Sequence, residues 1–497
     1  MKVLKDKYQA LISMSNPEID YITPTTFVES LESEAFTDFL QSVSRTSTPL
    51  LSITLPIAGI DPLAALELKS DYEEKFYWNH PENSISISAA GSIKVLKATG
   101  ADRFQDIAEQ TQKIKDEIEA YTVIEHSMAG PLFLGGYSFA DHNISKEWKP
   151  FGAARFVLPE WMLIEIGRLH LLTLTIVKAD RPADEIYQEV ISRITDFLNL
   201  AGHLNHKSNN NKNRTNILCT LQDTEDRNHW HKKVLKAKKL IQEGLFEKIV
   251  IARSVTLESK CKLEPTILAH HLREKYPACT NFLIQRNPDT SFIGATPERL
   301  ASFSNGIFLT EGLAGSISRG RSALEDATLA QTLIKSRKDR SEHQFVVKAI
   351  DLSLEQFSHS IDHPNSPQIK KLKNVQHLFT PIRASIKDGV QIHQLIQELH
   401  PTPAVGGFPK EDSVPHIYDI EQIDRGWYSA PVGWFNLNGC GEFAVAIRSA
   451  LLIKNIAKLY AGCGIVSDSE PETEWNESLL KFLPMMNALN QLDSGYE

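Results

Sequence analysis

Cysteine is scarce in this chain, and its placement matches no cysteine motif. The five cysteines are widely spaced, odd in number and never arranged as Cys-x-x-Cys: Cys219, Cys261, Cys279, Cys440 and Cys463. Disulfide frameworks and zinc knuckles use paired, closely spaced cysteines, so this pattern excludes both and favours reduced thiols. We therefore expect a cytosol-like, cytoplasmic environment.

The chain also lacks an excess of positive charge and long apolar runs. It has 53 Lys and Arg against 62 Asp and Glu, a net charge of −9. Nucleic-acid binding relies on a basic surface, so no nucleic-acid partner is expected. No run of about 18 apolar residues exists, and the first residues, Met1–Lys7, lead into no signal-length apolar core. We expect no membrane partner.

Several short catalytic motifs are missing as well. The sequence contains no Walker loop, no Gly-x-Gly-x-x-Gly, no His-Glu-x-x-His and no Gly-x-Ser-x-Gly. These absences argue against the functions that such motifs indicate, among them phosphate binding by a P-loop and hydrolysis by a serine at a nucleophile elbow.

Strand-like and helix-like patterns are mixed along the chain. Alternation predicts strands at Leu50–Pro56, Ser84–Ala89, Phe133–Phe139, Leu171–Val177, Lys248–Leu257, Phe292–Ala295, Ile307–Thr310, Phe443–Ile453 and Ile456–Val466. Helical spacing predicts helices at Ala101–Tyr121, Asp184–Leu200 and Leu329–Phe357, and from Pro471 onward. His359–Gln368 is predicted to be a polar loop. The mixture indicates an α+β fold.

One segment reads as a linker. His203–Thr215 is rich in asparagine and has almost nothing to bury, so it is predicted to be exposed. On composition alone it could separate two domains or be one long loop within a single fold.

Two separated segments indicate a ligand site. His400–Phe408 holds two prolines and then two glycines, which suits a loop whose backbone passes close to a ligand. On the last helix, Glu474, Glu477 and Lys481 fall on one face. A backbone cradle together with carboxylates indicates an anionic small molecule held through a metal, although such a stripe on a terminal helix is usually solvated.

Three other charged residues each allow two interpretations. Glu342 continues the apolar stripe of its helix, so it either pairs with a nearby cation or binds Mg²⁺. Arg448 stands among alanines and either pairs with a structural acid or binds a carboxylate. Lys248 opens a strand and either reaches out to water or acts as a base with a lowered pKa.

Three further positions complete the candidate site. Glu298, after a turn proline, is either a partner of Arg299 or an acid presented by a rigid turn. His377 is either structural or a hydrogen-bond donor to an anion. The backbone amides around Gly462, between a strand and the last helix, could hold a carboxylate.

Taken together, these segments resemble the chorismate-utilising enzymes, and among them the isochorismate synthases. The match runs in order over residues 240–490 and only loosely before residue 200. It rests on Phe246–Arg253, Gly294–Arg299, Leu313–Ser316, Lys338–His343, Val375–His377, the His400–Phe408 loop, Arg425–Tyr428, Phe443–Arg448, Ala461–Gly464 and Glu474–Glu477.

The resemblance implies one large α+β unit of β-sheets sandwiched between helices, and a Mg²⁺ cofactor. It implies a single domain over residues 1–497, with residues 1–200 as a divergent N-terminal half, 201–216 as an exposed polar loop and 240–490 as the catalytic segment. It therefore disfavours a two-domain division at the asparagine-rich linker. The expected partner is the small molecule chorismate, and the expected state is a monomer or weak homodimer.

The resemblance also assigns roles. Lys248 is implied as the base that activates water and Glu298 as the acid that protonates the departing hydroxyl. Glu342 and Glu477 are implied as metal ligands, with Glu474 acting through water. The implied substrate-binding residues are Gly315, Ser316, His377, Ala404, Tyr428, Arg448, Gly462 and Lys481.

Within the family, Lys248 and the form of the His400–Phe408 loop favour isochorismate synthesis, for menaquinone or phylloquinone production. The alternatives are a salicylate synthase, a siderophore-pathway isochorismate synthase, anthranilate synthase component I and a non-catalytic relative.

Overall fold

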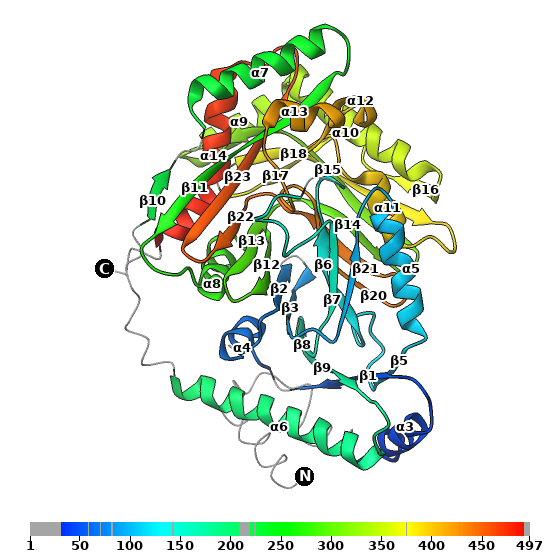
Figure 1. Ribbon diagram of the computed structural model, residues 1–497. Coiled ribbons are helices and arrows are strands. Elements are labelled where there is room, and N and C mark those ends of the chain that lie inside the picture. Colours follow the sequence, from blue (N-terminus) through cyan, green and yellow to red (C-terminus); the bar gives the residue numbers. More distant parts are fainter. Residues whose placement is uncertain are drawn as a thin grey trace.

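The computed structural model describes residues 31–491, apart from 58, 70, 81–82, 142–143, 208–218, 223–224 and 374. Of residues 200–207, 219–222 and 491 it gives the backbone alone. Two large, mostly antiparallel sheets form its centre (Figure 1). None of the described helices combines the length and apolarity needed to cross a bilayer.

The first sheet has thirteen strands. In spatial order they are β10 (Cys219–Gln222), β11 (Lys248–Ser259), β23 (Ile456–Ile465), β22 (Ser449–Ile453), β13 (Thr290–Thr296), β12 (Thr280–Asn287), β2 (Lys75–His80), β3 (Ile85–Ala90), β8 (Trp161–Ile166), β9 (Leu169–Val177), β1 (Leu50–Pro56) and β5 (Ile118–Thr122), with β19 (Gly407–Phe408) paired to β11.

The second sheet has ten strands. Their order is β16 (Ser358–Asp362), β18 (Val375–Ile386), β15 (Ile307–Ser318), β14 (Arg299–Ser304), β21 (Gly441–Val445), β20 (Pro431–Asn436), β6 (Leu132–Tyr137), β7 (Ala154–Leu158) and β4 (Lys94–Ala98), with β17 (Gln368–Lys371) paired to β18.

Helices cover the outer faces of both sheets (Figure 1). One buried cluster joins the first sheet to α3 (Glu34–Ser44), α4 (Pro62–Leu68), α6 (Ala183–Lys207), α8 (Pro265–Lys275) and α14 (Pro471–Gln491). Another joins the second sheet to α5 (Arg103–Lys115), α10 (Arg337–Glu355) and α11 (Ile392–Leu399). The remaining helices are α7 (Arg227–Gln242), α9 (Ala323–Lys335), α12 (Lys410–Ser413) and α13 (Ile417–Glu421).

A third cluster fills the space between the sheets. The strands divide their side chains by alternation, as β2 illustrates: Phe76 and Trp78 face the inter-sheet core, and Tyr77 faces the helices. Both faces of the central strands are therefore apolar. The predicted α+β fold, with sheets between helical layers, is confirmed; the single-domain assignment stays a prediction.

Several predicted boundaries were wrong. Leu329–Phe357 is two helices, because the Ser336 side chain accepts a hydrogen bond from the backbone N–H of Asp339 and starts a new helix. The helix predicted over Ala101–Tyr121 ends at Lys115, and Ile118 opens strand β5, parallel to β1. The predicted loop after His359 begins within strand β16.

Two further corrections concern a linker and a strand. Helix α6 continues to Lys207, so the first residues of the predicted polar loop are helical; residues 208–216 lie outside the described part. Phe443–Ile453 is not one strand: β21 belongs to the second sheet and β22 to the first. The chain changes sheet just before β22, where Arg448 has a left-handed φ of 53°.

Candidate active site

The candidate site lies where the chain twice passes between the sheets. One passage joins β13 to β14 through Glu298, and the other joins β21 to β22 through Arg448. Two backbone hydrogen bonds hold them side by side: Val445 N–H to the Glu298 carbonyl (3.1 Å) and Ala295 N–H to the Arg448 carbonyl (3.2 Å). Both charged side chains line the same cavity.

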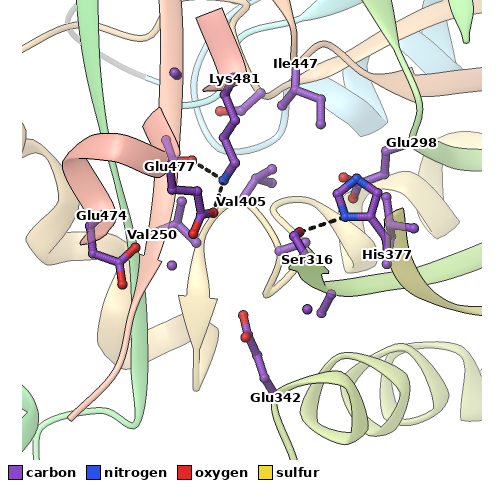
Figure 2. Close-up of a pocket in the computed structure, with 18 of the residues that line it drawn as sticks. Val250, Glu298, Ser316, Glu342, His377, Val405, Ile447, Glu474, Glu477 and Lys481 are labelled. Carbon is purple, nitrogen blue, oxygen red and sulfur yellow. Dashed lines mark hydrogen bonds and ion pairs between the residues drawn. The ribbon is translucent and has the colours of Figure 1, made fainter. Parts of the chain in front are cut away.

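Every site residue predicted from the sequence lines that cavity, which has a volume of about 290 Å³. The set is Lys248, Glu298, Gly315, Ser316, Glu342, His377, Ala404, Tyr428, Arg448, Gly462, Glu474, Glu477 and Lys481. Figure 2 shows Glu342 reaching in from α10 and Glu477 and Lys481 from α14.

Lys248 does not extend to water. It is only 3% exposed, and its Nζ donates to Glu342 Oε1 at 2.6 Å. Gly464 on β23 makes room for it, because a Cβ there would lie 2.7 Å from Lys248 Cε. The expectation that Glu342 pairs with a cation is met by this lysine, inside the cavity.

Glu298 is not a partner of Arg299. The Arg299 side chain instead lies 3.1 Å from His80 Nε2 and 4.0 Å from Glu442. Glu298 is 5% exposed, and burial, with a further contribution from Glu311, raises its pKa to about 8. The geometry therefore favours the reading of Glu298 as an acid presented by a rigid turn.

The acidic face of α14 is not a solvated stripe. Glu474 is 5% exposed, and burial next to Glu477 raises its pKa to about 7. Lys481 donates to Glu477 Oε1 (2.7 Å) and to the Gly462 carbonyl (2.7 Å), and its charge lowers the pKa of Glu477. This face contributes both signs of charge to the cavity.

One group of side chains has spacing suited to a metal ion. In the described part of the chain, Cys463, Glu474 and Glu477 place ligand atoms within 4.8 Å of one another. Glu342 is outside this group but faces the same cavity. Carboxylate oxygens are the donors that Mg²⁺ prefers, so Glu474 and Glu477 fit the predicted cation, whereas a thiol is a ligand for softer metals. The nearby thiol of Cys463 was not foreseen.

Arg448, whose guanidinium has no hydrogen-bonding partner among the described residues, and Tyr428 also line the cavity. The Arg448 guanidinium makes no hydrogen bond or ion pair with a described residue, so a structural acid is not its partner. Tyr428 stacks on Tyr460 with centroids 5.1 Å apart, and burial raises its pKa to about 12, so it stays a neutral donor. Both side chains are suited to a carboxylate ligand.

His377 and Ser316 form a hydrogen-bonded pair across β18 and β15. Ser316 Oγ lies 2.7 Å from His377 Nδ1 (Figure 2). Burial lowers the pKa of His377 to about 3, so the ring is neutral. A bulge at Gly315, with φ of 75°, shifts the strand register immediately before Ser316.

The Gly407 position of the His400–Phe408 loop needs glycine for a close contact within the protein. Gly407 pairs with Ile249 of β11, and a Cβ on Gly407 would clash with Ser413 and with the Lys248 carbonyl. The close approach at Gly407 is therefore to other parts of the protein, and the approach of this loop to a ligand stays a prediction. Ala404 and Val405 of this loop do line the cavity.

Sequence reasoning missed Arg425 as a site residue. Its guanidinium is buried and donates to the Glu421 carboxylate, to the carbonyls of Val405 (2.7 Å) and Val250 (2.9 Å), and to Ser429 Oγ (3.1 Å). It ties the loop to β11 at the wall of the cavity, which Arg425 itself lines. The spacing of Glu421 and Arg425 was the available signal, although the helix ends between them.

Replacing Arg425 by methionine is expected to destabilise the fold by about 3–5 kcal/mol, because it leaves the buried Glu421 charge without its partner. A urea titration of the free energy of unfolding checks this. Lys410→Met is the matched control, since Lys410 caps carbonyls of α11 and is outside the cavity lining. Equal stability of the two variants would contradict the structural role.

Comparison with known proteins agrees with this geometry. The family described as "Chorismate binding enzyme" matches residues 37–490. The chain is 36% identical to the salicylate biosynthesis isochorismate synthase of Pseudomonas aeruginosa, covering 87% of this chain and 89% of that one. It is 32% identical to isochorismate synthase MenF of Bacillus subtilis, covering 88% and 93%.

Solved structures show the same fold. Menaquinone-specific MenF of Escherichia coli aligns with a TM-score of 0.72 at 24% identity, covering 92% of this chain and 99% of that one. The chain therefore belongs to the chorismate-binding enzyme family. Within it, the protein is a chorismate-utilising enzyme that is about a third identical to isochorismate synthases.

Proposed function

We propose that the protein converts chorismate to isochorismate. The observation that carries the proposal is the shared cavity of Lys248, Glu298 and the glutamates Glu342, Glu474 and Glu477. Isomerisation by water addition at ring carbon 2 and loss of the hydroxyl at carbon 4 needs a base and an acid on the two sides of one ring. A buried amine and a protonated carboxyl in one cavity supply that combination.

Lys248 is the proposed base. Its amine lies at the start of β11, buried and held at 2.6 Å from Glu342, so its position is fixed before substrate enters. In the neutral form it accepts a proton from the attacking water at Nζ. Fixed placement of this kind lowers the entropic part of the barrier.

Glu298 is the proposed acid. Because its pKa is raised to about 8, the carboxyl is mainly protonated at neutral pH and can give its proton to the departing hydroxyl. The turn that holds it is fixed by the hydrogen bond from Val445 N–H to its carbonyl.

The carboxylates of chorismate are assigned to the cationic and donor groups. Arg448, Tyr428 and Lys481 provide charge and hydrogen bonds, with Gly462 keeping that wall open. A side chain at position 462 would approach Tyr428 Oη to 3.3 Å. Gly315, Ala404 and the Ser316–His377 pair shape the rest of the pocket and hold its polar edge.

Glu342 and Glu477, with Glu474 through water, are proposed to hold Mg²⁺. When bound, the ion supplies positive charge that orients and stabilises the substrate's ring carboxylate. Replacing Glu342 or Glu477 by alanine is expected to weaken Mg²⁺ binding. Loss of a residue that only supports a metal ligand costs roughly 10–100-fold in affinity, so loss of a ligand should cost at least that much.

Titration calorimetry with Mg²⁺ alone measures this, and Glu470→Ala, on a largely exposed side chain nearby, is the control. Mg²⁺ affinities equal to those of the unmodified protein would remove these residues from the ligand set.

Incubation of the pure protein with chorismate and Mg²⁺, followed by chromatography, tests the function. Isochorismate as the sole product is expected. Salicylate with pyruvate would instead identify a salicylate synthase, and anthranilate formed with ammonia an anthranilate synthase. Intact chorismate would indicate a non-catalytic relative.

We further propose that the product serves menaquinone or phylloquinone synthesis, in keeping with the near full-length match to MenF of Bacillus subtilis. The comparable match to the salicylate biosynthesis enzyme of Pseudomonas aeruginosa supports a salicylate or siderophore route as the second candidate. Deleting the gene should lower the cell's quinone content under the first proposal and leave it unchanged under the second.

A further inference from the structure

We propose that Glu311 and Lys370, an ion pair outside the substrate cavity, are positioning residues for Glu298. They hold the backbone on both sides of that acid and place two opposite charges behind it. This inference rests on the proposed role of Glu298 as the proton donor.

The pair clamps the turn that carries Glu298. Lys370 Nζ donates to the carbonyl of Pro297 at 2.9 Å, one residue before the acid. Glu311 Oε1 accepts from the backbone N–H of Arg299 at 2.9 Å, one residue after it. Lys370 Nζ also contacts both Glu311 oxygens, at 2.9 and 3.1 Å, which closes a ring of interactions around the turn.

The clamp is anchored in strands that form the cavity wall. Glu311 lies on β15, the strand that carries Ser316, and Lys370 lies on β17 directly opposite His377 of β18. Both side chains are therefore held by strands that are fixed in the sheet. If either side chain is replaced, the Glu298 turn loses a contact that holds its backbone in place.

Neither member of the pair can touch substrate. Glu311 is 7% exposed, and the two side chains line a separate small crevice with His80, Pro297 and Arg299. They are not among the residues that line the substrate cavity. An effect of either residue on turnover would therefore act through the cavity wall, and the Glu298 turn is the part of that wall whose backbone both residues bond directly.

The charges around Glu298 predict opposite effects for the two members. After burial, the negative charge of Glu311 acts most strongly to raise the pKa of Glu298. Three cations lower it: Lys370 on β17, Lys248 on β11 and Lys481 on α14. Removing Glu311 should thus favour ionised Glu298, and removing Lys370 should favour the protonated form.

The experiment compares Glu311→Gln and Lys370→Met in the full chain, with chorismate and Mg²⁺, by measuring kcat and KM against pH. We expect kcat to fall about tenfold or more in both, since small displacements of a catalytic group have large effects. KM should change less than about twofold, because substrate contacts are untouched. The basic limb of the kcat profile should move to lower pH in Glu311→Gln and to higher pH in Lys370→Met.

Lys371→Met is the matched control. Lys371 is the next residue on β17 and pairs with Asp326 at 2.8 Å, away from the Glu298 turn. Its kcat profile should be unchanged. Lys370→Arg, which keeps the charge and a donor, should recover most of the kcat lost in Lys370→Met.

Basic limbs that stay in place in both variants, or that move the same way, would overturn the proposal. So would a loss of activity matched by an equal loss of folded protein in circular dichroism. If either single variant fails to fold, the uncharged double variant Glu311→Gln/Lys370→Met serves instead, and a wild-type kcat there would overturn it. Absence of isochorismate with the unmodified protein would be a failure of the proposed function instead.

Discussion

Replacing Lys248 by alanine is expected to lower kcat for isochorismate formation by about 10²–10⁴-fold, the usual contribution of a positioned general base. Lys248 is buried against Glu342 and lies at the start of β11, and no other described residue holds an amine at that point of the cavity. Product formation followed by chromatography, at saturating chorismate and Mg²⁺, is the measurement.

The control for this variant is Lys458→Ala on the adjacent strand β23. That change removes an ion pair with Glu147 outside the cavity and should leave kcat unaltered. Circular dichroism should show both variants folded. A kcat for Lys248→Ala within a few-fold of wild type would remove Lys248 from the base role.

Replacing Glu298 by glutamine is the second substitution for which we expect a large loss of kcat. The amide keeps the size of the side chain but has no acidic proton, so we expect kcat to fall by about 10²–10⁴-fold. Chorismate binding, measured by calorimetry, should change little, because the carboxylates of the substrate are assigned to Arg448, Tyr428 and Lys481. Unchanged isochorismate formation by this variant would exclude Glu298 as the proton donor.

The raised pKa of Glu298 also predicts how kcat and the stability of the fold change with pH. The acid is protonated below about pH 8, so wild-type kcat should fall as the pH rises through that value. Because its folded-state pKa lies above its unfolded value, the ionised side chain destabilises the fold at high pH. Glu298→Gln should therefore unfold at pH 9 no earlier than wild type, in a thermal melt.

Much of the secondary structure could be predicted from the sequence, and every residue predicted for the candidate site lines one cavity. Strands such as Leu50–Pro56 and the start of α14 at Pro471 were correct, because alternation and helix-start signals are local properties. The break at Ser336 was also local, since Ser336 and Asp339 have the spacing of a helix cap, and it was overlooked.

Other errors had no local signal. Phe443–Ile453 alternates like one strand, yet it serves two sheets, because its two halves find different partners: β21 pairs with β14 and β22 with β13. The end of the helix predicted over Ala101–Tyr121 was likewise decided by pairing, since Ile118 lies opposite Leu50 in β1. Such pairings depend on residues far away in the chain.

The sequence by itself determined most of the helices and strands, the α+β class and the set of charged residues that resemble a chorismate-utilising site. Only the tertiary structure decided that Lys248 bonds Glu342, that Arg448 stays uncommitted, and that Glu311 and Lys370 clamp the turn of Glu298. The physical reason is range: periodicity and caps act over a few residues, whereas contacts between side chains and the burial that shifts a pKa arise only when distant strands meet.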